Sequence, residues 1–361
     1  MHKTRIVVFV PTLTSGGAEK QAMILAHVLK FEYTTFLVVW DGRKVEAKFK
    51  QYIDQNKIEY CFLCGSIFIR FIKLLLFLKR NKISIIFNFL ASSNFYGTIA
   101  GKLTRVKYII GGIRNAEISK LKLILQRFLH NNFLDYTIFN NLTGIQNLVT
   151  KGFNASKCVF IPNCYEEQVV PINRLPKFPV TIVSLARFVP QKDFYTALKA
   201  VQHLINFYKF DVSKIKYRII GYGEEELLIY SWIKELGLKD FVEMYINPFN
   251  ALDLVKESDI FLMTSLFEGT SNSIMEAMAL SLPIVATDAG DNRFLVDHNT
   301  NGYLAPLKDY KQISHFLYLL ASDYDKRNSF GLKAQRKIVD KYSLSIFNYN
   351  YIYFIKGFSN N

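Results

Sequence analysis

The sequence predicts an α/β fold of two doubly wound, Rossmann-like domains that face a cleft, and three observations lead to that prediction. The chain has 361 residues, of which 50% are hydrophobic and 21% charged, so it is globular and too long for one ordinary core. Short apolar runs alternate with helical patterns, which is typical of parallel β-α-β units. The alternation pauses once, at residues 166–179.

The first series of elements lies in residues 1–165, which we assign to an N-terminal domain. Its strands are predicted from apolar runs at 5–10, 35–40, 83–90, 106–113, 134–139 and 157–162. Helical patterns lie between most of these runs. The first helix is predicted over 18–30, where four apolar residues recur at helical spacing: Ala18, Ala22, Leu25 and Leu29.

Residues 166–179 are polar, contain Pro171, Pro176 and Pro179 and lack periodicity, so we predict an interdomain linker there. A second domain is predicted over 180–343. Its strands are expected at 180–186, 215–221, 241–246, 259–264, 283–287 and 302–305. Its helices are expected near 193–208, 224–236, 250–257, 272–281 and 309–322. The aromatic tail indicates a final helix near 344–356.

Positive charge is concentrated in the first half of the chain. The formal net charge is +15; residues 1–165 carry 23 Lys or Arg against 8 Asp or Glu, whereas residues 166–361 carry 22 of each kind. Such asymmetry indicates an anionic partner, which is a membrane surface, a nucleic acid or a phosphorylated substrate. Because no nucleic-acid recognition motif is visible, we do not expect nucleic acid as the partner.

Residues 66–80 are basic, aromatic and compatible with a helix. Two interpretations stay open: this helix lies on an anionic membrane, or it is an ordinary core helix before the next strand. Arg70 and Lys73 interrupt its apolar run, which is too short and too charged to span a bilayer. No secretory signal is visible before the first strand. We therefore expect a cytoplasmic protein, peripheral on the inner face of the cytoplasmic membrane.

The four cysteines predict neither a metal site nor a redox site. Cys61 and Cys64 form a C-x-x-C, but no second pair or histidine cluster completes a zinc set. We expect Cys61, Cys64, Cys158 and Cys164 to be reduced, buried thiols and expect no metal.

Two glycine-containing loops follow predicted strands, at the carboxyl ends where doubly wound sheets bind ligands. Gly16 and Gly17 precede the first helix, whose free N–H groups suit a diphosphate, although a tight turn without a ligand fits equally well. Gly221 and Gly223 follow a strand of the second domain. They permit close packing on a nucleotide base or sugar, or form a plain tight turn.

Two cations follow the first strand of the second domain. Arg187 and Lys192 are five residues apart at the carboxyl end of that strand, so both can reach one diphosphate. They would offset the negative charge that builds on a leaving nucleoside diphosphate. The alternative is that both are solvated surface cations.

Two glutamates flank the predicted start of a later helix. Glu268 lies in the loop after a strand and Glu276 in the first turns of the helix, so both carboxylates can face one cleft and accept hydrogen bonds from sugar hydroxyls. The backbone N–H groups between them suit phosphate or sugar oxygens. A local alternative stays open, because Ser273 and Glu276 also match a capping box.

The segment from Glu268 to Glu276, followed by Ala277-Met278-Ala279, closely resembles the E-x7-E motif of retaining glycosyltransferase family 4. Further motifs fit in the expected order, so the resemblance covers nearly the whole chain. They are Gly16-Gly17-Ala18-Glu19, Ile161-Pro162-Asn163, Ala186-Arg187 with Lys192, and Gly221-Tyr222-Gly223.

The resemblance implies a GT-B fold, with the donor bound mainly by the second domain, the acceptor by the first, and residues 344–361 returning to the first domain. It implies that Glu276 holds the donor ribose, that Glu268 approaches the transferred sugar, and that Arg187 and Lys192 neutralise the diphosphate in place of a metal. Gly16 and Gly17 would lie near the phosphate and the acceptor. Backbone groups that would meet the sugar and phosphates belong to Gly269, Thr270, Ser271, Asn272 and Ser273.

Two positions depart from the pattern of the family. Many relatives carry a histidine after the fifth strand, near the transferred sugar, where this chain has Arg114, which we place on the acceptor or donor-sugar side. His130 is too far along the chain to replace that histidine. A Gly-Gly pair common in the family is Gly290-Asp291 here.

The resemblance implies a retaining hexosyltransferase that uses a nucleotide diphosphate-sugar as substrate and needs no cofactor. The basic first half suggests a lipid-linked saccharide acceptor, as in bacterial surface polysaccharide assembly. The alternatives are another GT-B enzyme, such as a nucleotide-sugar epimerase or a phosphorylase-like protein, and a non-catalytic protein that binds nucleotide-sugar or acts as a membrane scaffold.

Overall fold

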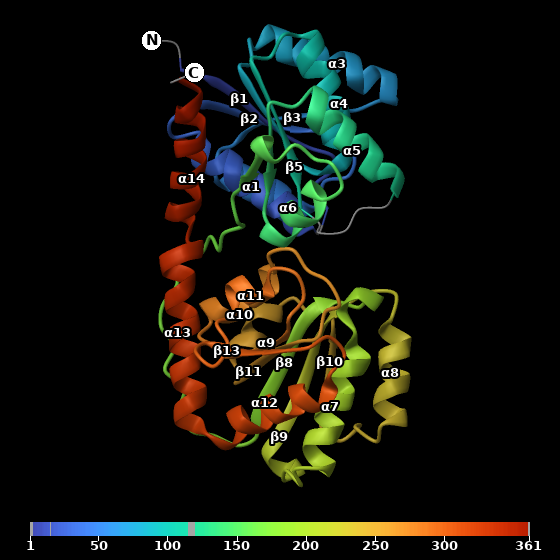
Figure 1. Ribbon diagram of the computed structural model, residues 1–361, viewed down its shortest axis with the longest axis vertical. Helices are drawn as coiled ribbons and strands as arrows, with labels where there is room; N and C mark the ends of the chain where they lie inside the picture. Colours follow the sequence, from blue (N-terminus) through green and yellow to red (C-terminus); the bar gives the residue numbers. More distant parts are fainter. Residues whose placement is uncertain (1–2, 15, 115–119, 360–361) are drawn as a thin grey trace. The chain divides into compact units, whose positions relative to one another are not determined.

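The computed structural model describes residues 3–14, 16–114 and 120–359, and these form two compact units. The first unit holds the chain up to Cys164 together with the residues from Ser345 onward, and the second holds Tyr165–Leu344. Each unit contains one parallel sheet with helices on its faces (Figure 1).

The sheet of the first unit has seven strands in the order β3-β2-β1-β4-β5-β6-β7. The interior strand β1 is buried from Ile6 onward and pairs in parallel with β2 and β4, so the middle of the sheet is covered on both faces. The strands are β1 (Arg5–Val10), β2 (Thr34–Val39), β3 (Glu59–Phe62), β4 (Ile85–Asn88), β5 (Tyr108–Ile113), β6 (Tyr136–Phe139) and β7 (Cys158–Phe160).

The helices of the first unit include a C-terminal one that returns from the other end of the sequence. Its buried Tyr351 ring lies 5.7 Å from the ring of Phe87 on β4, and the Tyr108 hydroxyl donates to the Phe358 carbonyl. The helices are α1 (Gly17–Leu29), α2 (Ala47–Gln55), α3 (Ile67–Arg80), α4 (Leu90–Leu103), α5 (Lys120–Asn132), α6 (Leu142–Val149) and α14 (Leu344–Lys356).

The second unit repeats this architecture with six parallel strands in the order β10-β9-β8-β11-β12-β13. The strands are β8 (Val180–Arg187), β9 (Ile215–Tyr222), β10 (Val242–Ile246), β11 (Ile260–Met263), β12 (Ile284–Thr287) and β13 (Gly302–Ala305). The helices are α7 (Phe194–Asn206), α8 (Glu226–Glu235), α9 (Ala251–Lys256), α10 (Asn272–Ala279), α11 (Asn292–Leu295), α12 (Tyr310–Ser322) and α13 (Tyr324–Tyr342), and a 3-10 turn, η2, spans Pro190–Lys192.

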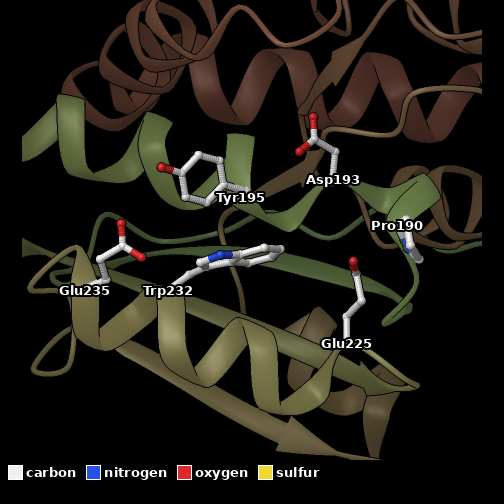
Figure 2. Close-up of a pocket in the computed structure, with 6 residues that line it drawn as sticks. All are labelled: Pro190, Asp193, Tyr195, Glu225, Trp232 and Glu235. Atoms are coloured by element: carbon white, nitrogen blue, oxygen red, sulfur yellow. The ribbon is translucent and has the colours of Figure 1, made fainter.

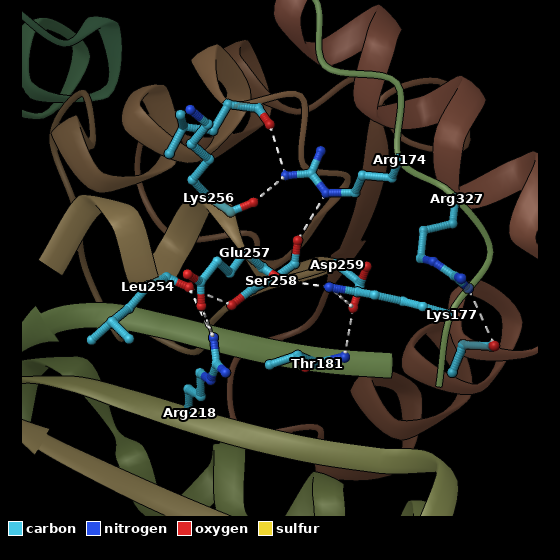
Figure 3. Close-up of polar contacts among 12 residues, drawn as sticks. Arg174, Lys177, Thr181, Arg218, Leu254, Lys256, Glu257, Ser258, Asp259 and Arg327 are labelled. Atoms are coloured by element: carbon cyan, nitrogen blue, oxygen red, sulfur yellow. Dashed lines mark hydrogen bonds and ion pairs between the residues drawn. The ribbon is translucent and has the colours of Figure 1, made fainter. Parts of the chain in front are cut away.

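The stretch that we predicted as a linker belongs to the second unit and is bound to it through Arg174 (Figure 3). The Arg174 guanidinium donates to carbonyls at the ends of α9 and α10, where the helix dipoles favour a cation. The four acceptors are the carbonyls of Lys256, Ser258, Leu280 and Ser281. Nearby, Lys177 donates to the Glu257 carbonyl at 2.7 Å. The segment therefore fixes the C-terminal ends of two helices.

Most predicted elements are present with small changes in their bounds. The final helix has the predicted bounds at its start and end, whereas the strand predicted over 83–90 is shorter because α4 already begins at Leu90. The strand β3 and the helix α11 were not predicted. Among the described residues no helix is both long enough and apolar enough to cross a membrane.

Candidate active site

The loops that follow β8 and β11 are joined by hydrogen bonds at the carboxyl edge of the second sheet. The Leu266 amide donates to the Gln191 carbonyl at 2.8 Å, and the Gln191 side chain donates to the Phe267 carbonyl at 2.6 Å. The Thr264 hydroxyl lies 3.0 Å from the Lys192 carbonyl. These bonds hold the η2 turn against the loop that carries Glu268.

The same contact brings together two of the three predicted catalytic residues. Lys192 Nζ donates to Glu268 Oε1, and the two side chains are 13% and 9% exposed. Because water is largely excluded, each charge depends on the other, and removal of one partner leaves a buried charge without compensation. Glu268 therefore has a fixed position at the end of β11.

Arg187, the third predicted catalytic residue, differs from Lys192 in its surroundings. It is the last residue of β8 and is exposed. Within the parts of the chain that the structure describes, no other side chain forms a hydrogen bond or ion pair with its guanidinium. This fork of N–H donors is thus available to a carboxylate or phosphate at the carboxyl edge of the sheet.

Gly290 is the glycine of the Gly290-Asp291 pair that matches the family pattern, and it lies against the loop of Glu268. Its φ is +55°, and a Cβ atom on it would lie 2.0 Å from the Glu268 carbonyl oxygen. Only glycine fits such a close approach in the left-handed region without moving the loop. Gly290 therefore lets the loop after β12 pack against the backbone of Glu268.

The start of α10 decides between the two interpretations of Glu276. The helix begins at Asn272, and the hydroxyl of Ser271 caps it by accepting a hydrogen bond from the Ile274 amide. Glu276 is then the fifth residue of the helix, too far along to serve as the acidic partner in a capping box. The capping-box alternative built on Ser273 is wrong.

Glu276 is half-buried and lies near Tyr165 in the same unit. Burial raises the pKa of the Tyr165 hydroxyl, and the charges of Glu167 and Glu276 raise that pKa further. The residues between the two glutamates surround the start of α10. Thr270 and Ser271 are buried, whereas Gly269, Asn272 and Ser273 are half-buried.

Two glycines at the end of β9, Gly221 within the strand and Gly223 just after it, pack against the chain itself. A Cβ atom on Gly221 would lie 1.9 Å from the Ala186 carbonyl oxygen, and one on Gly223 would lie 2.4 Å from the Phe188 carbonyl oxygen. These contacts with the backbone of Ala186 and Phe188, at and just after the end of β8, require glycine at both positions. Close packing of these glycines on a nucleotide base or sugar stays a prediction.

A pocket of about 420 Å³ lies beyond the η2 turn, between α7 and α8 (Figure 2). The rings of Tyr195 and Trp232 meet edge to face at 5.2 Å between centroids. The other lining residues are Pro190, Asp193, Glu225 and Glu235. Burial raises the pKa of Glu225, helped by the charges of Glu224 and Asp193. Three carboxylates and no cation line this pocket, so it does not suit a diphosphate.

In the first unit, the predicted phosphate loop has a carboxylate of the chain beside it. Gly16 is the N-cap of α1, and a Cβ atom on it would lie 1.9 Å from Glu19 Oε2. The buried Glu19 side chain thus lies against the start of the helix, where the dipole favours a negative charge. Gly17 is the first residue of the helix. The binding of phosphate by Gly16 and Gly17 stays a prediction.

Arg114 directly follows β5 and is buried at the carboxyl edge of the first sheet. Its guanidinium lies over the Phe89 ring at 4.4 Å and donates to Asn163 Oδ1 and to the Tyr351 hydroxyl, both at 3.3 Å. Its buried Nε has no hydrogen-bond partner in the described part of the molecule. Arg114 therefore links β5 to α14 through long hydrogen bonds to neutral groups.

The histidine and cysteines considered for catalysis, redox chemistry or metal binding are either packed within the fold or exposed. His130 is buried between the Thr137 hydroxyl and the Asn154 carbonyl, and burial lowers its pKa. Contrary to prediction, only Cys164 among the cysteines is buried, whereas Cys64 is exposed and all four are free thiols. In the described ranges, no group of three or more His, Cys, Asp or Glu residues is arranged to hold a metal ion.

A comparison with known families matches most of the second unit. Residues 166–337 match the family model described as Glycosyl transferases group 1, and this range includes Arg187, Lys192, Glu268 and Glu276. This segment is a glycosyl transferases group 1 domain. The domain contains all of the predicted donor-side residues except Gly16 and Gly17, which lie in the first unit.

Curated relatives of the chain include glycosyltransferases of polysaccharide biosynthesis. The amylovoran biosynthesis glycosyltransferase AmsK of Erwinia amylovora is 30% identical over 178 residues, which is 46% of this chain and 42% of that protein. The putative colanic acid biosynthesis glycosyltransferase WcaL of Salmonella typhimurium is 26% identical over 184 residues, 48% of this chain and 44% of its own length. The matches span less than half the length of these relatives.

Solved structures establish the fold of the whole chain as GT-B. Anabaena HepE in complex with UDP superposes with a TM-score of 0.84 at 17% identity, over 98% of this chain and 100% of that one. The lipopolysaccharide outer core galactosyltransferase WaaB superposes with a TM-score of 0.77 at 17% identity, over 99% and 100% of the two chains. At this identity the likeness concerns architecture alone.

Several residues that build the glycosyl transferases group 1 domain were not predicted. Thr264 and Gln191 join the two site loops, Arg174 fixes the end of α10, and Ser271 caps it. Only Ser271 had a local signal, because a serine before a helix is a common cap. The other three act through partners distant in sequence.

Proposed function

We propose that the chain is a retaining glycosyltransferase that moves a hexose-type sugar from a nucleotide diphosphate-sugar to a lipid-linked saccharide in bacterial surface polysaccharide assembly. The observation that carries the proposal is the buried Lys192–Glu268 pair beside the exposed Arg187, within the glycosyl transferases group 1 domain. Binding of a nucleotide diphosphate-sugar requires cations that bind the phosphates and a carboxylate that accepts hydrogen bonds from the sugar hydroxyls.

The donor nucleotide in this proposal is a uridine diphosphate. Support comes from the similarity to Anabaena HepE, which was crystallised with UDP and with UDP-glucose. Arg187 and Lys192 bind the diphosphate and take over the charge neutralisation that a metal ion performs elsewhere, Glu276 binds the ribose, and Glu268 contacts the transferred sugar. The backbone at the start of α10, from Gly269 to Ser273, contributes N–H donors to the sugar and phosphates.

The proposed reaction keeps the anomeric configuration by attack on the face from which the nucleotide leaves. The acceptor hydroxyl oxygen forms a bond to the anomeric carbon as the bond from that carbon to the β-phosphate oxygen breaks. The β-phosphate takes the acceptor proton, so no strong protein base is needed. Arg187 and Lys192 stabilise the charge that develops on the leaving group. The remaining rate acceleration comes from the orientation of the bound donor and acceptor.

The acceptor side of the proposal rests on the first unit. Relatives of the chain act in the biosynthesis of amylovoran and colanic acid, which supports a saccharide acceptor in surface polysaccharide assembly. Arg114 faces the carboxyl edge of the first sheet and contacts the acceptor or the transferred sugar. The excess of Lys and Arg in this unit supports work at the inner face of the cytoplasmic membrane.

Thermal unfolding of the purified protein with UDP, GDP and ADP, and with their common sugar conjugates, tests the donor side. We expect stabilisation by UDP and one UDP-sugar that EDTA does not remove. Product analysis with that donor then tests transfer. Sugar conversion without an acceptor would instead indicate an epimerase, and binding without turnover on any acceptor would indicate a non-catalytic protein.

A further inference from the structure

One layer of the first unit is basic and almost free of carboxylates. Residues 60–134 contain twelve Lys or Arg but a single Asp or Glu, which accounts for most of the net charge of +15. They include α3, α4 and α5, and α4 packs against both of the other two helices (Figure 1). The charge excess is thus gathered on neighbouring helices.

The outer side of α5 is apolar, which is the reverse of an ordinary surface helix. Leu121 is 84% exposed, and Ile124, Leu125 and Phe128 are also exposed. The buried residues of the helix are Gln126, Leu129 and His130, so two of the three are polar. A helix that packs on a core normally turns its apolar stripe inward and its polar residues outward. The exposed cations of α5 are Lys120, Lys122 and Arg127.

The helix α3 also has apolar residues on its outer side, although it buries Leu74 and Leu78. It buries Arg70, which forms an ion pair with Asp41 at 3.2 Å and lies over the Trp40 ring at 5.0 Å. Its exposed apolar residues are Ile67, Phe68, Ile69, Ile72 and Leu76, with Phe68 73% exposed. Its exposed cations are Lys73, Lys79 and Arg80. The core interpretation of this helix holds for one side of it, since Leu74 and Leu78 pack in the core, and the membrane interpretation of its exposed side stays a prediction.

We infer that the outer sides of α3 and α5 form one docking surface for an anionic lipid bilayer, with α5 inserted as well as α3. Apolar side chains from both helices enter the boundary between headgroups and acyl chains, and the lysines and arginines bind anionic headgroups. Charge alone would also suit a nucleic acid, but a nucleic acid would leave Leu121, Phe128 and Phe68 in water. The inference deepens the proposed membrane setting and does not depend on sugar transfer.

Flotation with vesicles tests the surface directly. The wild-type protein should bind phosphatidylglycerol-containing vesicles at low salt and bind pure phosphatidylcholine vesicles much less. The double variant Leu121→Ser/Phe128→Ser should bind the anionic vesicles at least about tenfold more weakly, because two apolar side chains no longer leave water. Lys120→Gln/Lys122→Gln should weaken binding by about fivefold for each lysine at low salt and have little effect at high salt.

Leu227→Ser is the matched control, because Leu227 is 82% exposed on α8 but follows Glu224, Glu225 and Glu226. It should leave vesicle binding unchanged. All variants alter exposed side chains, so their unfolding temperatures and their stabilisation by UDP should equal those of the wild type. Failure of UDP binding would thus count against the donor proposal alone. Two results with vesicles would overturn the docking surface: no binding of the wild-type protein to anionic vesicles, or unchanged binding of the α5 double variant. Displacement of the protein from these vesicles by duplex DNA at equal charge concentration would also overturn it.

Discussion

The two units carry similar parallel sheets but treat the cations at their carboxyl edges differently. In the second unit Lys192 is paired with a buried carboxylate, and the loops around it are joined by side-chain hydrogen bonds. In the first unit Arg114 has only long hydrogen bonds to neutral groups, and the cations of α3 and α5 other than Arg70 are exposed. The second unit therefore holds Lys192 in an internal ion pair and leaves Arg187 exposed, whereas the first unit leaves most cations of these two helices exposed.

The largest effect should follow from breaking the internal pair of the second unit. Lys192→Ala leaves Glu268 buried without its partner, so we expect a loss of about 3 kcal/mol in the free energy of unfolding. We also expect kcat/KM to fall by about 10²–10³-fold, because a positioned charge is lost. Urea unfolding and transfer kinetics measure the two effects. The double variant Lys192→Met/Glu268→Met should regain much of the stability but none of the activity, and a fully active Lys192→Ala would contradict the assignment.

Arg187 should separate catalysis from stability within the same unit. Because its side chain is exposed, Arg187→Ala should change the free energy of unfolding by less than about 0.5 kcal/mol. The loss in kcat/KM should nevertheless reach about 10²–10³-fold. If Arg187→Ala is as active as the wild type, the assignment of Arg187 to the active site is wrong. The variant Arg187→Lys keeps the positive charge and shows how much of the effect depends on the planar guanidinium.

Substitutions of Ser271, which caps α10, and of Glu276, within that helix, should have opposite effects on stability and donor binding. Ser271→Ala removes the helix cap and should cost about 1 kcal/mol of stability. Glu276→Ala should leave stability nearly unchanged and weaken donor binding by about tenfold, because a charged hydrogen bond to the ribose is lost. Calorimetric titration with UDP measures the affinity. Loss of stability in Glu276→Ala with normal affinity would assign that carboxylate to the fold.

The smallest effect on the donor should come from Arg114 in the first unit. Arg114→Met keeps the contact with Phe89 and removes the charge, so UDP should stabilise the variant as it does the wild type. The KM for the acceptor should rise by about tenfold, in line with the loss of one charged contact. A change in UDP affinity with an unchanged acceptor KM would reverse the assignment and place Arg114 on the donor side.

Sequence patterns identified the residues of the second-unit candidate site, but they did not reveal the contacts that fix its geometry. Glu268 and Lys192 are 76 residues apart, yet both follow strands, and in a parallel sheet the ends of neighbouring strands meet at one edge. The sequence left a capping box on Ser273 open as an alternative, because both Ser271 and Ser273 suit a helix start, and the structure places the cap at Ser271. Arg174 gave no local signal, since its acceptors lie more than 80 residues away.

In the first unit, periodicity identified elements but not the direction of their apolar sides. The bounds of α14 followed from its aromatic pattern, whereas the edge strand β3 is short and half exposed, and was missed. The reversal of α5 was invisible, because an apolar stripe has the same spacing whether it faces the core or water. The exposure of its individual side chains in the structure reveals it.

The first unit is built from two distant pieces of chain, and this has a consequence for its synthesis. When a ribosome has translated as far as Tyr342, the chain of the second unit is almost complete, but the first still lacks α14 and the Tyr351 hydroxyl that Arg114 binds. Nascent domains usually fold in order from the N-terminus. Here the domain that begins first is finished last, so a chaperone or the membrane has time to meet its apolar helices before it closes.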